Sequence, residues 1–250
     1  MTGPSRERLD RNGQVDLAWK GKGMNELLVI IPAYNEEMNI RSVIRGLREH
    51  AGEWDVLVVD DGSTDGTGEV CREMGIDLVR HRVNLGLAEA VRTGIRAAIS
   101  RGYSYVMQFD GDGQHDASAI GRLLTTARNT GADIVIGSRY LQGDDGPPGK
   151  RAGRRLISLC MQAVCGQQLA DPTSGMRLMN RRVMERFACS GFYLPEPDTL
   201  TYLIRKGFRV LEVPVAMNDR LHGKSYLTLP ESLRYCFRMM TSILFLQWMH

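Results

Sequence analysis

The sequence is poor in cysteine and in net charge, and no apolar stretch in it reaches the length of a membrane-spanning helix. Its five cysteines form no CxxC pair and have no zinc-ligand spacing, so we expect reduced thiols in a cytosolic compartment. The formal net charge of +3 in 250 residues is too small to indicate a nucleic-acid partner. No charged and then apolar leader opens the chain, so we expect the protein not to be exported.

Two common nucleotide-binding motifs are also missing. No glycine-rich phosphate loop of the Walker type occurs, and no G-x-G-x-x-G follows the first predicted strand. These absences argue against an ATPase and against a dinucleotide-dependent dehydrogenase. What the chain does have is the composition of a globular protein, 43% hydrophobic and 24% charged, with enough residues for a substantial core.

Short apolar strands alternate with helical patterns from residue 26 onward. Each predicted strand is rich in Val, Ile or other apolar residues: Leu27–Ile31 (ended by Pro32), Val56–Val59, Ile76–Val79, Tyr105–Phe109 and Ile134–Ile136. Between them, Leu87, Val91, Ile95 and Ala98 repeat at helical spacing. This alternation predicts an α/β fold with a mostly parallel central sheet flanked by helices. We expect a flexible tail over residues 1–24, one domain over residues 25–229, and a C-terminal helix over residues 230–250.

Local rules assign helix starts close to the ends of the first two strands. Asn35 is expected to cap a helix, with Glu36 and Glu37 in its first turn, where the helix dipole favours acidic groups. Ser63 or Thr64 is expected to cap the helix that follows the second strand.

Acidic side chains gather where predicted strands end, which is where open α/β sheets bind their ligands. Asp60 and Asp61 follow the second strand, and because one cap would suffice there, the second acid indicates hydrogen bonds to a base or a ribose. Asp110 and Asp112 follow a later strand at i and i+2, a spacing that points both carboxylates to the same side of an extended chain. Carboxylate oxygens suit Mg²⁺ or Mn²⁺, which keep positions open for phosphate oxygens, although Asp and Gly also fill ordinary turns.

The chain resembles family-2 glycosyltransferases of the GT-A fold, in the group of polyprenyl-phosphate (dolichol-phosphate) sugar synthases. The matching residues occur in order along the chain: Ile31-Pro32-Ala33-Tyr34-Asn35-Glu36, Val58 to Thr67, Asn84-Leu85-Gly86, Phe109 to His115, Gly137-Ser138-Arg139, Ser174-Gly175-Met176-Arg177 and Glu212-Val213-Pro214-Val215. Because the match extends over most of the chain, it is more specific than any one of these motifs.

The resemblance implies a role for each of these acidic sites. The residues implied to bind the nucleotide sugar are Pro32, Tyr34, Glu36, Asp60, Asp61 and Asp110. The implied ligands of Mg²⁺ or Mn²⁺ are Asp110, Asp112 and Gln114, with Asp112 also counted as catalytic. His115 is left out of catalysis, because Asp116 is expected to start a helix directly after it.

Arginines are the expected partners of phosphate groups, because a guanidinium offers planar bidentate bonding and stays charged. The resemblance places Arg139 and Arg177 at the reacting phosphates, and Arg220 and Lys224 in a late loop that closes over the acceptor. The family usually has lysine directly after Ser225, whereas this sequence has Tyr226, which weakens the assignment of the acceptor.

An acceptor phosphate needs no general base, since its second pKa is about 6, whereas a hydroxyl acceptor does. Asp171 is the candidate, either as a base or as a residue that positions the acceptor. For Glu196 and Asp198 the alternative is an acidic helix start next to Pro197.

The C-terminal segment is predicted to be either a helix docked on the core or a helix in the membrane interface. Pro230 and Glu231 suit its start, Arg234 and Arg238 could meet lipid head groups, and the apolar candidates are Phe237, Leu246 and Trp248. A second basic contact could come from Lys150, Arg151, Arg154 and Arg155. The apolar run itself is shorter than the about 20 residues that cross a bilayer.

These observations together predict a metal-dependent inverting glycosyltransferase. We expect it to move a hexose from UDP-glucose or GDP-mannose to a polyprenyl phosphate, as a peripheral protein at the cytoplasmic face of the cell membrane or with a small membrane-protein partner. One alternative keeps the donor and uses a hydroxyl acceptor, such as a surface polysaccharide or a small metabolite. A second alternative is a non-catalytic scaffold that binds a nucleotide sugar.

Overall fold

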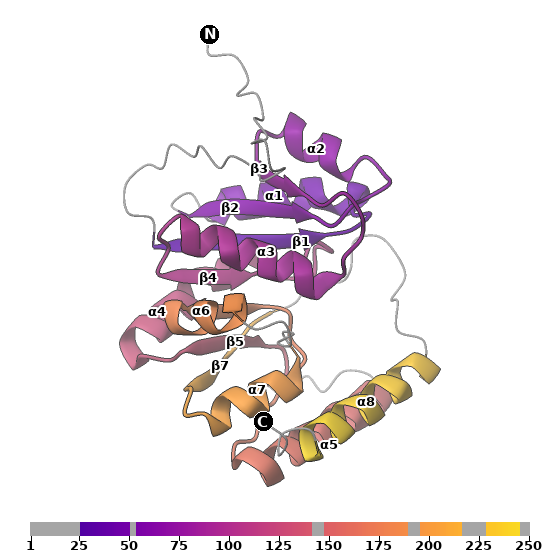
Figure 1. Ribbon diagram of the computed structural model, residues 1–250, viewed down its shortest axis with the longest axis vertical. Coiled ribbons are helices and arrows are strands. Elements are labelled where there is room, and N and C mark those ends of the chain that lie inside the picture. The colour runs from indigo at the N-terminus through magenta and orange to yellow at the C-terminus, as the bar shows by residue number, and fades with distance from the viewer. Residues whose placement is uncertain (1–25, 51–53, 142–147, 190–195, 217–228, 246–250) are drawn as a thin grey trace.

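Seven strands form one sheet in the part of the chain that the computed structural model describes, which is residues 26–50, 54–141, 148–189, 196–216 and 229–245. The strands are β1 (Leu27–Ala33), β2 (Asp55–Asp60), β3 (Asp77–Arg80), β4 (Tyr105–Gln108), β5 (Ile134–Ser138), β6 (Arg177–Asn180) and β7 (Val210–Pro214). Their order is β3-β2-β1-β4-β6-β5-β7 (Figure 1). Only β6 runs antiparallel to its neighbours, so the predicted mostly parallel sheet is confirmed.

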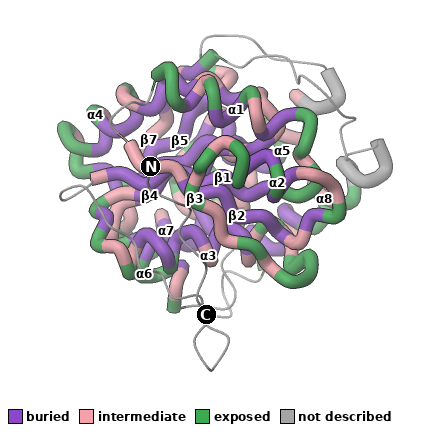
Figure 2. The backbone as a smooth tube through the Cα atoms, turned by 90° about the horizontal axis from the view of Figure 1, so that it is seen from above, coloured by how far each residue is buried: buried purple, intermediate pink, exposed green. Residues whose placement is uncertain are grey.

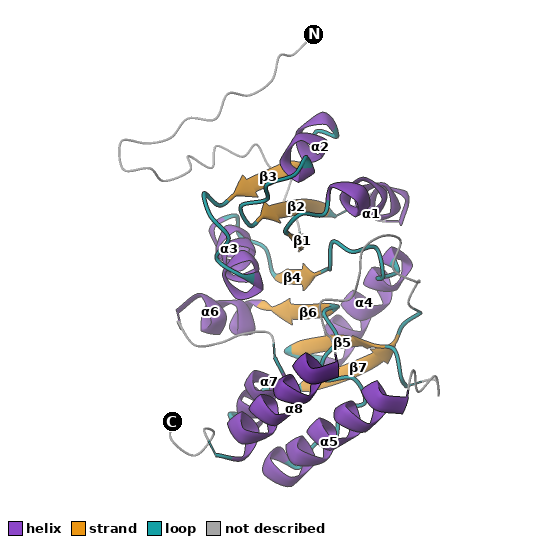
Figure 3. Ribbon diagram, turned by 90° about the vertical axis from the view of Figure 1, so that its right-hand side faces the viewer, coloured by secondary structure: helices purple, strands orange, loops and turns teal. Residues whose placement is uncertain are grey.

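Helices cover both faces of this sheet, as predicted (Figure 3). One face is covered by α1 (Glu37–His50), α2 (Thr67–Glu73), the short 3₁₀ turn η1 (Ala117–Ala119) and α4 (Ile120–Thr130). The other face is covered by α3 (Leu87–Ser100) and α6 (Arg181–Cys189). Three further helices pack together beside β5 and β7: α5 (Pro148–Cys165), α7 (Pro197–Arg205) and α8 (Leu229–Leu244).

The central strand β1 shows why the strands are apolar on both sides. Leu28 and Ile30 pack into the core under α3, whereas Leu27, Val29 and Ile31 pack into the core under α1 and α4. All five are buried, and Figure 2 shows the buried strands enclosed by more exposed helices. Successive side chains alternate between faces, so a parallel sheet covered on both sides needs apolar residues at every position.

Pro32 does not end the first strand, contrary to the sequence-based prediction. β1 continues to Ala33, and Pro32 pairs in register with Val59 of β2. Ile30 bonds toward β4, since its carbonyl accepts the Phe109 N–H at 3.0 Å, and Pro32 faces the same side, where β4 has already ended. The missing proline N–H therefore leaves no ladder bond unmade.

The predicted caps of the first two helices are also wrong. Asn35 adopts a positive φ of 55°, and its side chain accepts a hydrogen bond from the Thr64 N–H rather than from α1, which begins at Glu37. At α2 the N-cap position is Gly66, which has no side chain to cap the helix, and neither Ser63 nor Thr64 takes this role. The Thr67 N–H donates instead to Asp65 Oδ1. These polar groups join the two loops at the ends of β1 and β2, a long-range contact that a local rule does not anticipate.

Two other predicted helix starts are confirmed. Asp116 accepts a hydrogen bond from the Ser118 N–H at the start of η1, and α7 begins at Glu196 and Pro197 with Asp198 in its first turn. α8 contacts α5 and α7, and its docked face runs through Met239, Ser242 and Ile243. The predicted tail, Leu246 and Trp248, and the side chain of Lys150 lie outside the described residues, and the division into tail, domain and terminal helix stays a prediction.

Candidate active site

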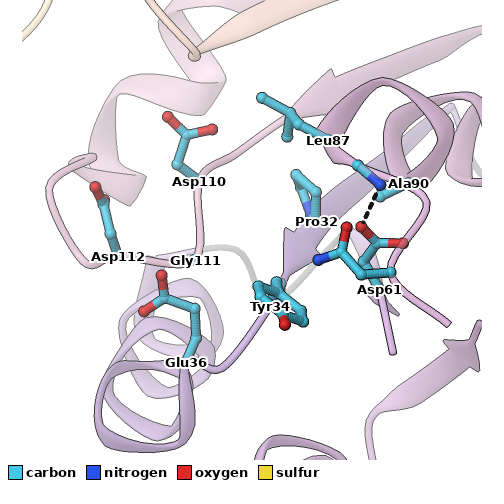
Figure 4. Close-up of a pocket in the computed structure, with 12 residues that line it drawn as sticks. Pro32, Tyr34, Glu36, Asp61, Leu87, Ala90, Asp110, Gly111 and Asp112 are labelled. Atoms are coloured by element: carbon cyan, nitrogen blue, oxygen red, sulfur yellow. Dashed lines mark hydrogen bonds between the residues drawn. The ribbon is translucent and has the colours of Figure 1, made fainter. Parts of the chain in front are cut away.

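A cavity of about 350 Å³ opens at the carboxyl ends of β1, β2 and β4 (Figure 4). Its walls come from the ends of β1 and β4, the loop after β2 and the start of α3: Pro32, Ala33, Tyr34, Glu36, Asp61, Asn84, Gly86, Leu87, Ala90, Asp110, Gly111 and Asp112. All the residues predicted to bind the nucleotide sugar belong to this wall except Asp60. The rule that parallel sheets bind ligands at their carboxyl ends therefore locates this cavity correctly.

Asp61 lies at one end of the cavity, and three hydrogen-bond contacts fix its carboxylate. Its Oδ1 accepts the Leu85 N–H at 2.9 Å, and its Oδ2 accepts the Gly86 N–H at 2.7 Å. His81 Nδ1 lies 2.7 Å from Oδ1, and the other ring nitrogen lies 2.9 Å from the Thr93 hydroxyl. The second acid after β2 is thus held rigidly against the loop before α3, facing the space where a ligand would sit.

Asp60, by contrast, is fully buried behind the cavity. Its Oδ1 accepts the Ser63 N–H at 2.8 Å, and Arg80 Nε lies 3.1 Å from its Oδ2. The side chain therefore shapes the loop after β2 and does not reach the cavity. A direct contact with a nucleotide would require this loop to open.

Three carboxylates surround the other end of the cavity, those of Glu36, Asp110 and Asp112 (Figure 4). Asp110 and Asp112 both line the cavity, although the chain turns at Gly111 and Asp112 and is not extended there as predicted. Asp112 Oδ1 also accepts the Gln114 N–H at 3.1 Å. Gln114 itself is absent from the residues that line the cavity.

His115 supports this loop from beneath. The ring is buried, its Nδ1 accepts the Asp110 N–H at 3.1 Å, and it packs edge-on against Phe109 at 5.2 Å. His115 Nε2 also lies 3.5 Å from Asp110 Oδ2, and the exclusion of His115 from catalysis stays a prediction.

The carboxylates at this end of the cavity have the chemistry to bind a hard divalent cation. Within the described ranges, no three His, Cys, Asp or Glu side chains converge as a complete ion site. Mg²⁺ and Mn²⁺ in phosphate-handling sites are usually bound by one or two carboxylates and complete their coordination with water and substrate phosphates. Asp110 and Asp112, which share one cavity wall, fit a cation that binds together with a diphosphate.

Gly175 brings a third segment of the chain against Asp110. A Cβ atom at position 175 would lie 2.1 Å from Asp110 Oδ2 and 2.6 Å from Asp110 Cγ. The loop is fixed there, because the Ser174 hydroxyl donates to the Gly137 carbonyl at 2.6 Å and Arg177 Nε donates to the Ser174 carbonyl at 2.7 Å. Only glycine can occupy this position without displacing the carboxylate.

Arg139 and Asp171 form a bidentate ion pair beside this loop. Arg139 donates from Nε to Oδ2 at 2.6 Å and from Nη2 to Oδ1 at 2.7 Å, and its backbone N–H also reaches Oδ2 at 3.2 Å. Burial lowers the pKa of Arg139, but the hydrogen bond and charge of Asp171, with help from Asp110, outweigh it and raise the pKa overall. Asp171 is fully buried and both its oxygens accept hydrogen bonds from Arg139, a geometry that favours the positioning alternative over the base.

Arg177 lies in the interior rather than at the cavity. Its side chain is buried and donates to the carbonyls of Ser174 and Pro172, both at 2.7 Å. Burial lowers the pKa of Arg177, although the charges of Asp171 and Asp110 oppose this. The structure therefore places Arg177 as a support of the loop that carries Gly175. Arg220 and Lys224, the predicted groups of the late loop, lie outside the described residues.

Sequence reasoning missed two features of the site. Leu87 was expected only as part of a helical repeat and Ala90 was not singled out, but both line the cavity, and Leu87 is 55% exposed. The signal was present in the preceding Gly86, whose φ of 91° turns the chain into α3. Glu212 is the second: its carboxylate accepts the backbone N–H groups of Ala170 and Asp171, at 2.6 and 2.7 Å.

Comparisons with known proteins agree with this geometry. Residues 28–187 match the family described as Glycosyl transferase family 2. A polyprenol monophosphomannose synthase from Mycolicibacterium smegmatis is 34% identical over 216 residues, which cover 80% of each chain. An undecaprenyl-phosphate mannosyltransferase from Micrococcus luteus is 31% identical and covers 81% of this chain and 87% of its own.

Solved structures show the same fold at lower sequence identity. Glucosyl-3-phosphoglycerate synthase from Mycobacterium tuberculosis aligns with a TM-score of 0.64 at 20% identity, over 88% of this chain and 80% of its own. A mannosyltransferase from Pyrobaculum calidifontis, in complex with GDP-Man and Mn²⁺, aligns with a TM-score of 0.61 at 18% identity, over 88% of this chain and 69% of its own.

The sheet, the cavity at its carboxyl edge and the paired aspartates define a sugar-transferring enzyme of the GT-A fold. The chain belongs to glycosyltransferase family 2. The predicted family and fold are both confirmed.

Proposed function

We propose that this glycosyltransferase moves a hexose from a nucleotide diphosphate sugar to a polyprenyl phosphate. The use of a nucleotide sugar as donor is supported by one observation: the same cavity has Asp61 at one end and the Asp110 and Asp112 carboxylates at the other. The similarity to the two polyprenyl-phosphate mannosyltransferases supports the acceptor half. It also favours GDP-mannose as the first donor to test, with UDP-glucose next.

On the donor side, each carboxylate has a separate task. Asp61, held by the loop between β3 and α3, accepts hydrogen bonds from the base, and Tyr34 and Leu87 provide apolar surface beside it. Asp110 and Asp112 are the residues that would hold Mg²⁺ or Mn²⁺. When bound, this cation neutralises the charge that develops on the leaving diphosphate. Gln114 stays a predicted third ligand.

On the acceptor side, the chain provides the positive charge of Arg139 and no general base. An acceptor phosphate is already anionic near neutral pH, since its second pKa is about 6. Its oxygen attacks the anomeric carbon in line, the new C–O bond forms as the bond to the diphosphate breaks, and the nucleoside diphosphate leaves. Arg139 orients the acceptor phosphate with the donors that Asp171 does not take. The commitment of Asp171 to Arg139 argues against a hydroxyl acceptor, which would need that carboxylate.

The helices α5 and α8 are the proposed contact with the membrane. Phe237 on α8 and Phe245, directly after the helix, are 66% and 68% exposed, and Arg234 and Arg238 are exposed on α8. On the neighbouring α5, Leu156 and Leu159 are exposed too. Exposed apolar side chains next to arginines suit the boundary between acyl chains and head groups. No helix within the described ranges is long and apolar enough to span a bilayer.

The test uses the purified full chain, Mn²⁺, a short polyprenyl phosphate and a panel of nucleotide sugars, with nucleoside diphosphate release as the readout. We expect release that requires one donor and the lipid phosphate together. Asp112→Asn should lower the rate by roughly 100-fold or more, the usual cost of losing a charged group at the reacting centre. Asp116→Asn is the matched control, because Asp116 lies in the same loop but caps η1 and does not line the cavity.

Other outcomes would redirect the proposal. If release does not depend on the lipid phosphate but increases with a hydroxyl acceptor, the proposed polyprenyl phosphate acceptor is wrong. Equal rates for Asp112→Asn and the wild type would overturn the donor half.

A further inference from the structure

Glu212 is a half-buried carboxylate that does not line the cavity but contacts the loop that supports it. It comes from β7, and its two oxygens accept two successive peptide N–H groups, Oε2 from Ala170 at 2.6 Å and Oε1 from Asp171 at 2.7 Å. Burial raises the pKa of Glu212, an effect that the two backbone hydrogen bonds oppose. A carboxylate that accepts two successive N–H groups has a specific geometric effect, because it holds two adjacent peptide planes at once.

The second of those peptides carries the side chain that holds Arg139. Asp171 is fully buried, so its orientation follows from its backbone. Its two oxygens take the Nε and Nη2 hydrogens of Arg139 at 2.6 and 2.7 Å. A bidentate pair fixes the orientation of the guanidinium as well as neutralising its charge, since two parallel hydrogen bonds align its plane with the carboxylate plane. A line of contacts thus runs from β7 through the 170–171 peptide to Arg139.

The same segment is held from α5, but through other atoms. The Ser158 hydroxyl donates to the Leu169 carbonyl at 2.6 Å, and Arg154 Nη1 donates to the Ala170 carbonyl at 3.0 Å. These contacts fix the carbonyl groups of the segment, whereas Glu212 fixes its N–H groups. Satisfying two buried N–H donors would be reason enough for a carboxylate here, so a purely structural role is the alternative to exclude.

We propose that Glu212 is a positioning residue for Arg139, and sets the direction in which that arginine meets the acceptor phosphate. Its link to phosphate rests on the proposed function, whereas its link to Arg139 does not. If the carboxylate is lost, the N–H ends of these two peptides are no longer held, the segment shifts about its anchored carbonyls, and Asp171 and the Arg139 guanidinium move with it. Misplacing a reacting group by about 1 Å costs roughly 100-fold in rate.

The first measurement needs no substrate. The Arg139 Nε–H signal in ¹⁵N-labelled protein is assigned by its loss in Arg139→Lys, and its exchange with water is measured in wild type and in Glu212→Gln. An amide side chain has a single acceptor oxygen, so one of the two backbone bonds is lost. We expect the Arg139 signal to exchange at least tenfold faster in Glu212→Gln. Gln167→Ala is the matched control, because Gln167 joins the same segment to β7 through the Val210 carbonyl at 2.8 Å, and there the signal should not change.

The second measurement is a double-mutant cycle on kcat/KM for the acceptor. Glu212→Gln should lower kcat/KM by 10- to 100-fold in the wild-type background and by less than twofold when Arg139 is already lysine. Equal losses in both backgrounds, or an unchanged Arg139 signal, would overturn the proposal and leave Glu212 as a structural residue. Should Glu212→Gln not fold, Glu212→Asp decides in its place: it keeps both acceptor oxygens on a shorter stem, and the same two outcomes apply. A wild type without turnover would contradict the proposed function, while the exchange measurement would still test Glu212.

Discussion

Gly175 gives the sharpest test of the active-site geometry, through the single methyl group that Gly175→Ala would add. The new Cβ would lie 2.1 Å from Asp110 Oδ2, whereas ordinary contacts begin at 3.4 Å, so one partner must move by 3.4 − 2.1 = 1.3 Å. Ser174 and Arg177 anchor the loop on either side through hydrogen bonds of 2.6 to 2.7 Å. The Asp110 carboxylate is the freer partner, since its side chain is 35% exposed, and we expect it to be displaced.

The magnitude follows from that displacement. A shift of about 1 Å in a group that must be placed accurately costs roughly 100-fold in rate. Overpacking of this kind also costs about 1–3 kcal/mol of folding free energy. We therefore expect kcat/KM to fall by about 100-fold, and the Mn²⁺ concentration for half-maximal rate to rise, in a protein that still folds.

The assay is nucleoside diphosphate release at a series of Mn²⁺ concentrations, with thermal unfolding measured on the same samples. Gly46→Ala is the matched control: Gly46 lies inside α1 with no heavy atom within 4 Å of a Cβ, so the change should leave turnover intact and stabilise the protein by about 0.5–1 kcal/mol. The reasoning is refuted if Gly175→Ala keeps wild-type kcat/KM and Mn²⁺ dependence, because the position of Asp110 would then not limit the reaction.

Three further predictions concern stability and reactivity. Gly94→Ala should lower the free energy of unfolding by about 1–3 kcal/mol in guanidinium titrations, because its Cβ would lie 2.8 Å from Ile30 Cγ2 where α3 crosses β1; an unchanged midpoint would contradict that close packing. Burial raises the pKa of Asp65, but hydrogen bonds from Thr67 outweigh it and lower the pKa overall, so the stability that Asp65 adds is present above its ordinary pKa of 3.8 and is lost as pH falls through the lower folded value. The stability gap between wild type and Asp65→Asn in urea should therefore be wider at pH 6 than at pH 3, and a constant gap would refute this. Burial, followed by the charge of Asp60, raises the pKa of Cys71 to about 11, so at pH 8 iodoacetamide should modify exposed Cys189 and spare Cys71, as mass spectrometry would show; equal labelling would contradict the burial of Cys71.

Much of the fold follows from local patterns in the sequence. Runs such as Leu27–Ile31 are apolar at every position, which only a strand covered on both faces requires, and the structure places such a strand at the centre of the sheet. The Asp110-Gly111-Asp112 motif likewise identifies two acids that line the cavity, but the chain turns at Gly111 and Asp112 after the end of β4, so the extended-chain reasoning is wrong.

The sequence by itself determined the fold class, the family and the edge of the sheet where the ligand site lies, because periodicity, turn residues and motif spacing are encoded over a few neighbouring positions. Only the tertiary structure decided what each polar group does. Asp60 and Asp61 are adjacent in sequence, yet one is buried against Arg80 and the other faces the cavity. Arg139 and Arg177 follow similar short motifs, yet Arg139 pairs with Asp171 and is 30% exposed, whereas Arg177 is buried and supports a loop from the interior. The physical reason is that burial and hydrogen-bond partners come from segments tens of residues away, such as Glu212 on β7, and their positions are set only when the sheet and its loops assemble.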